Sequence, residues 1–266
     1  MVLVIAVMLT YEQHLNPGRD EWAVFIHGAG GNGKTWSYQV EQFKPYFNLL
    51  LIDLRDHGES KNIQPAYEKY RFEIISLDIK KVLDHLRIES AHFITLSFGS
   101  VLLQHFTMQY PGMVKKVILA GAIFRGNALI KSFVYLARMM NKILSYPAMY
   151  SLFSYLLMPR SRNQKARRLY QMQARRLTQV EYLKWVGLYQ EFFKLLNDFF
   201  KQKLTWPTLI IMGSDDFIFL RSAKAFSNGQ SHARLEVIPG TGHICNIENP
   251  DRFNSLALEF LLVKDL

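Results

Sequence analysis

Residues 94–100, Ile-Thr-Leu-Ser-Phe-Gly-Ser, place a serine between two segments of different character. Residues 91–94 before it are typical of a buried strand, and residues 101–110 after it are typical of a helix that a Pro-Gly pair ends. Ser97 is therefore predicted on a sharp strand-to-helix turn, where the helix N-terminus favours developing negative charge. The motif is G-x-S-x-G with Thr95 at the first glycine. It fits either a nucleophile or an ordinary turn in which Ser97 caps the helix.

Two later stretches offer the partners that a nucleophilic serine needs. A serine hydroxyl is a weak nucleophile at neutral pH and requires a base, which in turn requires an orienting group. A predicted strand at 206–212 is followed by the run GSDD, ending at Asp216, which offers a carboxylate. Another at 235–239 is followed by GTGH, ending at His243, which offers an imidazole. Because an open parallel sheet places its ligands at the carboxyl ends of its strands, we expect Ser97, Asp216 and His243 to converge.

The chain order serine, aspartate, histidine is that of the α/β-hydrolases, and most of the sequence resembles this family. Family members carry the acid three residues after the glycine that ends its strand, which implies Asp216 rather than Asp215. Residues 55–60, RDHGES, resemble the family turn D-x-R-G-H-G-x-S with Asp56 in place of a glycine. The resemblance further implies no metal ion and no organic cofactor.

Alternating strand and helix patterns predict a mostly parallel sheet with helices on both faces. Together with the family resemblance they predict an eight-stranded sheet. The predicted strands are 2–9, a segment around 11–14, 22–26, 49–53, 91–94, 117–120, 208–212 and 235–238. The predicted helices of this part are 72–86, 101–110, a segment near 221–226, and 250–262.

The glycine-rich loop after residue 26 has two interpretations. Gly28 to Thr35 fits G-x-x-x-x-G-K-[ST], the phosphate-binding loop, and residues 49–53 resemble a strand that ends in a magnesium-binding aspartate. In a hydrolase the same loop supplies the backbone N–H of Ala29 to an oxyanion hole, with the N–H of Phe98 as the second donor. We favour the hydrolase, because a nucleotide site would leave the serine, aspartate and histidine unexplained.

Residues 123–204 differ from the rest of the chain in charge. They contain 15 Lys and Arg but 3 Asp and Glu, a net charge of +12 within a total of +10. Their patterns are helical, which predicts a helical cap inserted between two parts of a hydrolase core, 1–122 and 205–266. Residues 159–176 hold seven cations and no acid. This charge fits a cap that packs on the core, or one that also makes peripheral contact with an anionic membrane. No recognition motif accompanies it, so we do not expect a nucleic-acid partner.

The resemblance implies a serine hydrolase that works through an acyl-enzyme. The predicted pocket residues, Gly28, Phe217, Ile218 and Ile244, favour a small-molecule substrate with an apolar acyl group, and a carboxylic ester is the leading class. Hydrolysis of a lactone or of a C–C bond next to a carbonyl stays open, as does a signalling protein with little turnover. Aspartate-nucleophile dehalogenases and epoxide hydrolases are excluded because position 97 is serine.

The remaining expectations concern location. The composition, 49% hydrophobic and 20% charged, is ordinary for a soluble globular protein. The single cysteine, Cys245, favours a reducing compartment, and residues 2–9 lack the features of a signal peptide, so we expect a cytoplasmic protein. The sequence does not indicate an oligomeric state.

Overall fold

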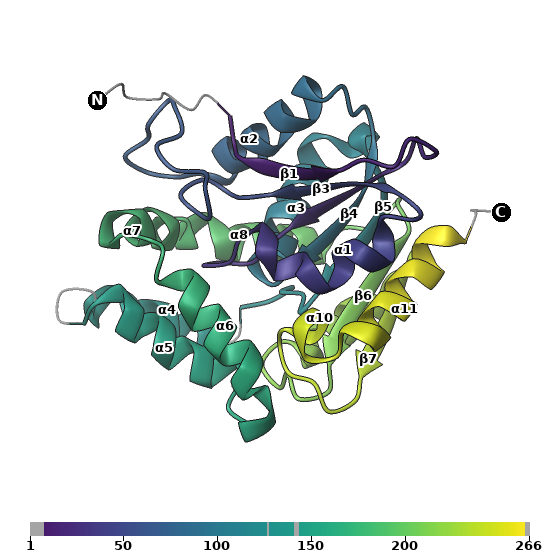
Figure 1. Ribbon diagram of the computed structural model, residues 1–266. Helices are drawn as coiled ribbons and strands as arrows, with labels where there is room; N and C mark the ends of the chain where they lie inside the picture. The colour runs from purple at the N-terminus through teal and green to yellow at the C-terminus, as the bar shows by residue number, and fades with distance from the viewer. Residues whose placement is uncertain (1–7, 127, 141–143, 264–266) are drawn as a thin grey trace.

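The computed structural model describes residues 8–126, 128–140 and 144–263. One sheet runs through them, with the strand order β1-β3-β2-β4-β5-β6-β7 (Figure 1). The edge strand β1 is antiparallel to its neighbour β3, and every other pair is parallel. The strands are β1 (Tyr11–His14), β2 (Trp22–Ile26), β3 (Asn48–Ile52), β4 (Ala91–Leu96), β5 (Val114–Ala120), β6 (Thr208–Gly213) and β7 (Ala233–Ile238).

The mostly parallel sheet is confirmed, and the described residues contain seven of the eight predicted strands. The predicted strand 2–9 falls largely on residues 1–7, which lie outside the described residues, and Met8 and Leu9 are not in a strand. Strands β3 and β4 are buried along their whole length, as expected for parallel strands covered on both faces.

The register of the sheet brings four loops to one edge. Ile26, Thr95, Leu119, Ile210 and Leu235 lie opposite one another in successive strands. The loops that follow β2, β4, β6 and β7 therefore leave the sheet together at its carboxyl edge.

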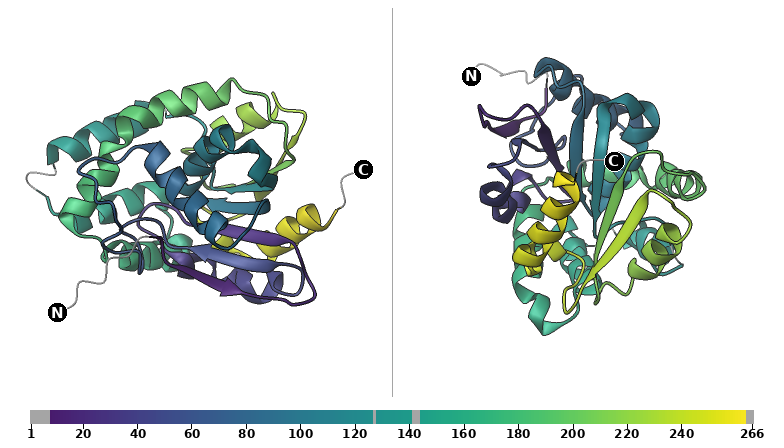
Figure 2. Two further views of the ribbon diagram at one scale, coloured as in Figure 1. Left: turned by 90° about the horizontal axis from the view of Figure 1, so that it is seen from above. Right: turned by 90° about the vertical axis from the view of Figure 1, so that its right-hand side faces the viewer.

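Helices cover both faces of the sheet (Figure 2). Helix α1 (Ser37–Phe43) packs against α11 (Pro250–Leu262) on one face, while α2 (Phe72–His85) and α3 (Phe98–Gln109) pack together on the other. Helix α9 (Leu220–Ser227) packs on β6 and β7. The short helices of the core are η1 (Gly33–Trp36), η2 (Pro111–Met113) and α10 (Cys245–Glu248).

Every regular element described between β5 and β6 is a helix. Helices α4 to α7 gather beyond one end of the sheet, and α8 leads back to pack on α3 (Figure 1). The helices are α4 (Ala128–Met140), α5 (Tyr146–Leu157), η3 (Ser161–Asn163), α6 (Gln164–Ala174), α7 (Gln179–Gly187) and α8 (Tyr189–Phe200). We call residues 123–204 the cap segment. Tyr146, Tyr150, Ala174, Leu177 and Tyr182 form a small hydrophobic cluster of its own. Among the described residues, no helix combines the length and apolarity needed to cross a membrane.

Candidate active site

Ser97 stands on a strained turn between β4 and α3. Its backbone has φ 53° and ψ −120°, a conformation that non-glycine residues seldom adopt. Its N–H donates to the carbonyl of Ala120 at 2.9 Å, and its carbonyl accepts from the N–H and the hydroxyl of Ser100 at 2.9 and 2.6 Å. These bonds hold the serine at the end of the strand, as in a nucleophile elbow.

The chain lacks two of the glycines in the family motifs. Gly99 is retained, and a Cβ there would lie 2.6 Å from the carbonyl oxygen of His27, where α3 passes β2. Thr95 replaces the motif's first glycine, and its hydroxyl donates to the carbonyl of Ile118 at 3.2 Å. At the other motif, Asp56 has φ 65°, a left-handed backbone that explains why the family has a glycine at this position.

The structure brings the predicted serine, histidine and aspartate together. His243 Nε2 lies 2.7 Å from Ser97 Oγ, and His243 Nδ1 lies 2.7 Å from Asp216 Oδ2. The imidazole and the carboxylate are buried, and the second oxygen of Asp216 accepts the N–H of Phe219 at 3.1 Å. Gly121 packs on the histidine, since a Cβ there would lie 2.5 Å from the carbonyl oxygen of His243. The chain of contacts has the geometry of a nucleophile, its base and an orienting acid.

Asp215, the neighbouring carboxylate, faces the cap segment instead. It forms ion pairs with Arg160, at 3.0 Å, and with Arg162. The neighbouring cap residue Asn163 donates to Glu248, and Glu248 accepts the N–H of Gly242 at 2.9 Å. The sequence did not reveal these contacts, which join the cap segment to the loops beside Asp216 and His243.

Two predicted oxyanion donors border the serine. Ala29 and Phe98 line the same cavity as Ser97, and Gly28 packs on the serine, since a Cβ at Gly28 would lie 3.1 Å from Ser97 Cβ. Within the described chain, the N–H groups of Ala29 and Phe98 donate to no protein acceptor. They are therefore available to an oxygen of a bound carbonyl.

Two buried histidines brace the loop that carries Ala29. In each ring Nδ1 donates to a backbone carbonyl and Nε2 accepts from a backbone N–H, so both rings are neutral. The pairs are His27 with Gly28 O (2.7 Å) and Leu54 N (3.0 Å), and His57 with Arg55 O (2.9 Å) and Gly30 N (3.0 Å). Burial lowers the pKa of His27, and it lowers the pKa of His57 well below its usual value.

This burial predicts a loss of stability in mild acid. On unfolding, each ring takes up a proton once the pH is below about 6.5, whereas the folded ring resists protonation. Stability is thus fully present above that pH and is lost as the pH falls toward the lower folded pKa. His57 alone should contribute about 1 kcal/mol to the loss between pH 7.0 and 5.5. Urea unfolding of wild type and of His57→Gln, whose amide does not titrate, should show a shallower pH dependence in the variant. Equal slopes would contradict the assignment.

The phosphate-binding interpretation of the loop is not supported by its contacts. The Asp53 carboxylate, which would bind magnesium, accepts the N–H of Gly33 at 2.6 Å and that of Glu59 at 2.8 Å. Asn32 caps the following helix by accepting the N–H of Lys34 at 3.0 Å. Donors that a phosphate would need are thus already used by side chains of the protein.

A cavity of about 200 Å³ ends on Ser97 and His243. Its walls come from the core and from α4 to α8 of the cap segment. Among the described residues that line it there is no aspartate, glutamate, lysine or arginine, and His243 is the one histidine. Apolar and aromatic side chains dominate, and Thr35 and Gln173, joined by a 3.2 Å contact, form one polar point.

The structure places two of the four predicted pocket residues on this cavity. Gly28 and Ile244 line the cavity, but Phe217 and Ile218 do not. Phe217 is 56% exposed, because the turn after Asp216 directs it outward and brings Phe219 to the cavity instead. The predicted pocket set names none of the aromatic residues that the cap segment contributes, because their sequence signal is only the richness of that segment in aromatic residues. These aromatic residues include Tyr150, Phe153, Tyr170, Tyr182, Trp185 and Phe192.

No group of three or more His, Cys, Asp or Glu side chains suited to a metal ion occurs among the described residues.

Comparisons with known proteins agree with this geometry. The sequence model of the alpha/beta hydrolase fold family matches residues 23–250. A Pseudomonas protein named 2-hydroxy-6-oxononadienedioate/2-hydroxy-6-oxononatrienedioate hydrolase is 30% identical over 91% of this chain and 88% of its own. The structure of an enol-lactonase from Burkholderia xenovorans is similar at TM-score 0.77, with 19% identity over 96% of each chain. An esterase from Exiguobacterium antarcticum is similar at TM-score 0.78, with 20% identity over 96% of each chain.

The chain belongs to the α/β-hydrolase family, which confirms the resemblance noted in its sequence. It is a hydrolase, and the proteins that it resembles are named for different substrates.

Proposed function

We propose that this protein hydrolyses uncharged carboxylic esters with an apolar acyl group. Ser97 attacks the ester carbonyl, and His243 Nε2 takes the hydroxyl proton and returns it to the leaving alcohol. Asp216 holds His243 with Nδ1 protonated and stabilises the imidazolium that forms. A water that His243 activates then releases the acyl group from Ser97.

The N–H groups of Ala29 and Phe98 stabilise the tetrahedral oxyanion in this proposal. They come from two different loops, and each loop is fixed by contacts that do not involve substrate. Preorganised donors of this kind cost no rearrangement as charge develops, and one such donor typically contributes about 10²–10³ in kcat.

The absence of charged side chains from the described walls of the cavity is the observation that favours an uncharged substrate. The Pseudomonas relative is named for dioates, which carry two carboxylates. A carboxylate buried without a cation or several hydrogen-bond donors is strongly disfavoured. The described walls of this cavity offer no lysine or arginine to such a group. A neutral ester or a neutral lactone fits them, and an apolar acyl chain gains from contact with their aromatic side chains.

A matched pair of esters tests the proposal. 4-Nitrophenyl pentanoate and the 4-nitrophenyl half-ester of glutaric acid have the same number of acyl carbons and differ in a terminal methyl or carboxylate. We expect kcat/KM to be at least about 10²-fold higher for the pentanoate, because the carboxylate would lie unpaired in the cavity. A series from acetate to dodecanoate then measures the preferred chain length.

Two outcomes would favour the alternatives. Equal rates for the matched pair would show that the cavity accepts a carboxylate and would favour hydrolysis of a C–C bond in an anionic substrate. Labelling of Ser97 by a fluorophosphonate with negligible turnover of every ester would favour a low-turnover ligand-binding protein.

A further inference from the structure

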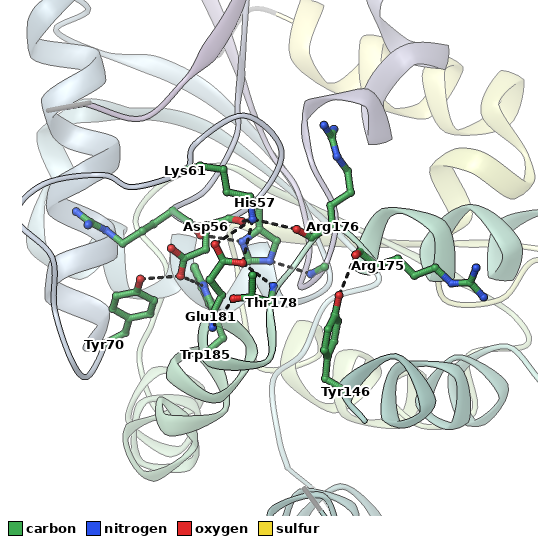
Figure 3. Close-up of polar contacts among 12 residues, drawn as sticks. Asp56, His57, Lys61, Tyr70, Tyr146, Arg175, Arg176, Thr178, Glu181 and Trp185 are labelled. Atoms are coloured by element: carbon green, nitrogen blue, oxygen red, sulfur yellow. Dashed lines mark hydrogen bonds and ion pairs between the residues drawn. The ribbon is translucent and has the colours of Figure 1, made fainter. Parts of the chain in front are cut away.

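Asp56 occupies the one position of the 55–60 turn where the sequence departs from the family's glycine. Its backbone is left-handed, at φ 65°, so a side chain here is carried at a conformational cost that glycine would avoid. The side chain is 7% exposed and lies between the core and helix α7 of the cap segment (Figure 3). A buried carboxyl group at a position suited to glycine needs hydrogen-bond donors, with which a glycine could form no side-chain bond.

Two aromatic donors meet the carboxyl group of Asp56. Oxygen Oδ2 accepts the hydroxyl of Tyr70 at 2.6 Å and the indole N–H of Trp185 at 3.3 Å. Tyr70 belongs to the core, and Trp185 belongs to α7. One oxygen atom therefore links the core to a cap residue through hydrogen bonds that both lie out of water.

Trp185 lines the substrate cavity, and its ring makes several further contacts. It packs edge-on against His57, with ring centroids 4.8 Å apart, and against Phe98, at 5.9 Å. His57 accepts the N–H of Gly30 and so holds the loop that carries Ala29, the first oxyanion donor. Phe98 carries the second oxyanion N–H. The position of the Trp185 ring thus affects the shape of the cavity wall and the packing of His57 and Phe98.

The start of α7 is tied to the same core loop by a separate set of contacts. Lys61 donates to the two oxygens of Glu181, at 3.1 and 3.0 Å, and to the carbonyl of Arg176 at 3.0 Å (Figure 3). Glu181 also closes a capping box with Thr178 at the helix N-terminus. Lys61 also donates to the backbone carbonyl of Asp56. The helix is therefore anchored without the carboxyl group of Asp56, which leaves that group to fix the indole.

We infer that Asp56 is a specificity-determining residue that positions Trp185 as the wall of the acyl cavity. The inference rests on the proposed esterase function. Without an acceptor at Asp56, the indole N–H would be buried unpaired, so the ring would turn toward another partner. The cavity would then lose a fixed wall, and discrimination between acyl chains of similar length would fall.

The readout is the ratio of kcat/KM for the preferred 4-nitrophenyl ester to that for the ester two carbons longer. Asp56→Gly suits the left-handed backbone and removes the acceptor, and we expect it to lower this ratio by about fivefold or more. Trp185→Phe keeps an aromatic ring but lacks the N–H, and should also lower the ratio. Asp56→Asn keeps an acceptor oxygen, and asparagine tolerates this backbone, so the ratio should stay within about twofold of wild type.

The double variant and a matched control separate positioning from general damage. If Asp56 acts through the indole N–H, Asp56→Gly should change the ratio little further in a Trp185→Phe background. Tyr70→Phe removes the other donor to the same carboxyl group and leaves the cavity wall in place, so the ratio should be unchanged.

Several results would overturn the inference. They are an unchanged ratio in Asp56→Gly or in Trp185→Phe, fully additive effects in the double variant, or a shift in Tyr70→Phe as large as in Asp56→Gly. If Asp56→Gly does not fold, Asp56→Ala, which also removes the acceptor, takes its place in each comparison. Failure of wild type to turn over any ester would refute the proposed function, whereas normal wild-type turnover with unaltered ratios would refute only the role of Asp56.

Discussion

Ser97→Ala should abolish ester hydrolysis, with a loss in kcat of about 10⁶, the scale found when a triad nucleophile is removed. Fluorophosphonate labelling should disappear as well, because the reagent would have no activated hydroxyl to modify. The variant should keep its fold, since alanine is smaller than serine and the bonds of the turn are made by the backbone of residue 97. Mass spectrometry of the labelled protein and a spectrophotometric ester assay measure the two effects.

A control serine on α9 makes the comparison specific. Ser227→Ala removes a hydroxyl that donates to the carbonyl of Lys224 at 3.2 Å, outside the cavity and the triad. It should retain wild-type labelling. Labelling or hydrolysis at the wild-type rate in Ser97→Ala would refute the assignment of the nucleophile.

Asp216→Asn should lower kcat by about 10³–10⁴, because an amide can favour the wrong tautomer of the histidine and cannot stabilise the imidazolium. Asp215→Asn is the matched control, with the same chemical change one residue earlier. Asp215 pairs with Arg160 and Arg162 rather than with His243, so we expect less than about a tenfold loss in kcat.

Asp215→Asn should change mainly the stability of the protein, whereas Asp216→Asn should change mainly kcat. Weakening the ion pairs of Asp215 should lower the thermal midpoint, measured by circular dichroism, although kcat falls by less than about tenfold. The opposite ranking of the two variants in kcat would mean that the orienting acid is misassigned by one residue.

Much of the core and of the site could be predicted from sequence because both depend on local patterns and on sheet geometry. Buried strands such as β2 and β6 are short apolar runs bounded by glycine-rich turns. Parallel strands deliver their following loops to the same edge, so Ser97, Asp216 and His243 could be expected to meet although more than a hundred residues separate the first from the others. The chain order of the three then indicated the family.

The cavity could not be predicted in the same way, because neighbours in sequence are poor guides to neighbours across a turn. Phe217 follows Asp216 directly, yet it faces solvent, whereas Trp185 lies far along the chain and forms a wall. Asp56 was visible only as a departure from a motif. Its role depends on Tyr70 and Trp185, which only the folded chain brings to it.

The cationic side chains of the cap segment make different kinds of contact. Arg160, Arg162 and Arg176 pair with core acids, and Arg167 is buried and donates to backbone carbonyls of the cap. Peripheral contact with an anionic membrane stays a prediction, to be tested by co-sedimentation with phosphatidylserine vesicles at low and high salt. The exposed cations on α6 and directly after it that could serve it are Lys165, Arg168 and Arg175.

The contacts of Asp215, Glu248 and Asp56 with the cap segment bear on how this enzyme could be recombined with its relatives. All three are buried or half-buried core acids with partners in residues 123–204, and they lie beside the acid, the base and the oxyanion loop respectively. A cap grafted from another hydrolase would leave them facing side chains not selected to receive them, at sites where an unpaired charge is costly. The exchangeable unit of this chain is therefore the cap together with these three core positions, and a chimera that changes the cap alone would disturb the loops that hold the catalytic groups.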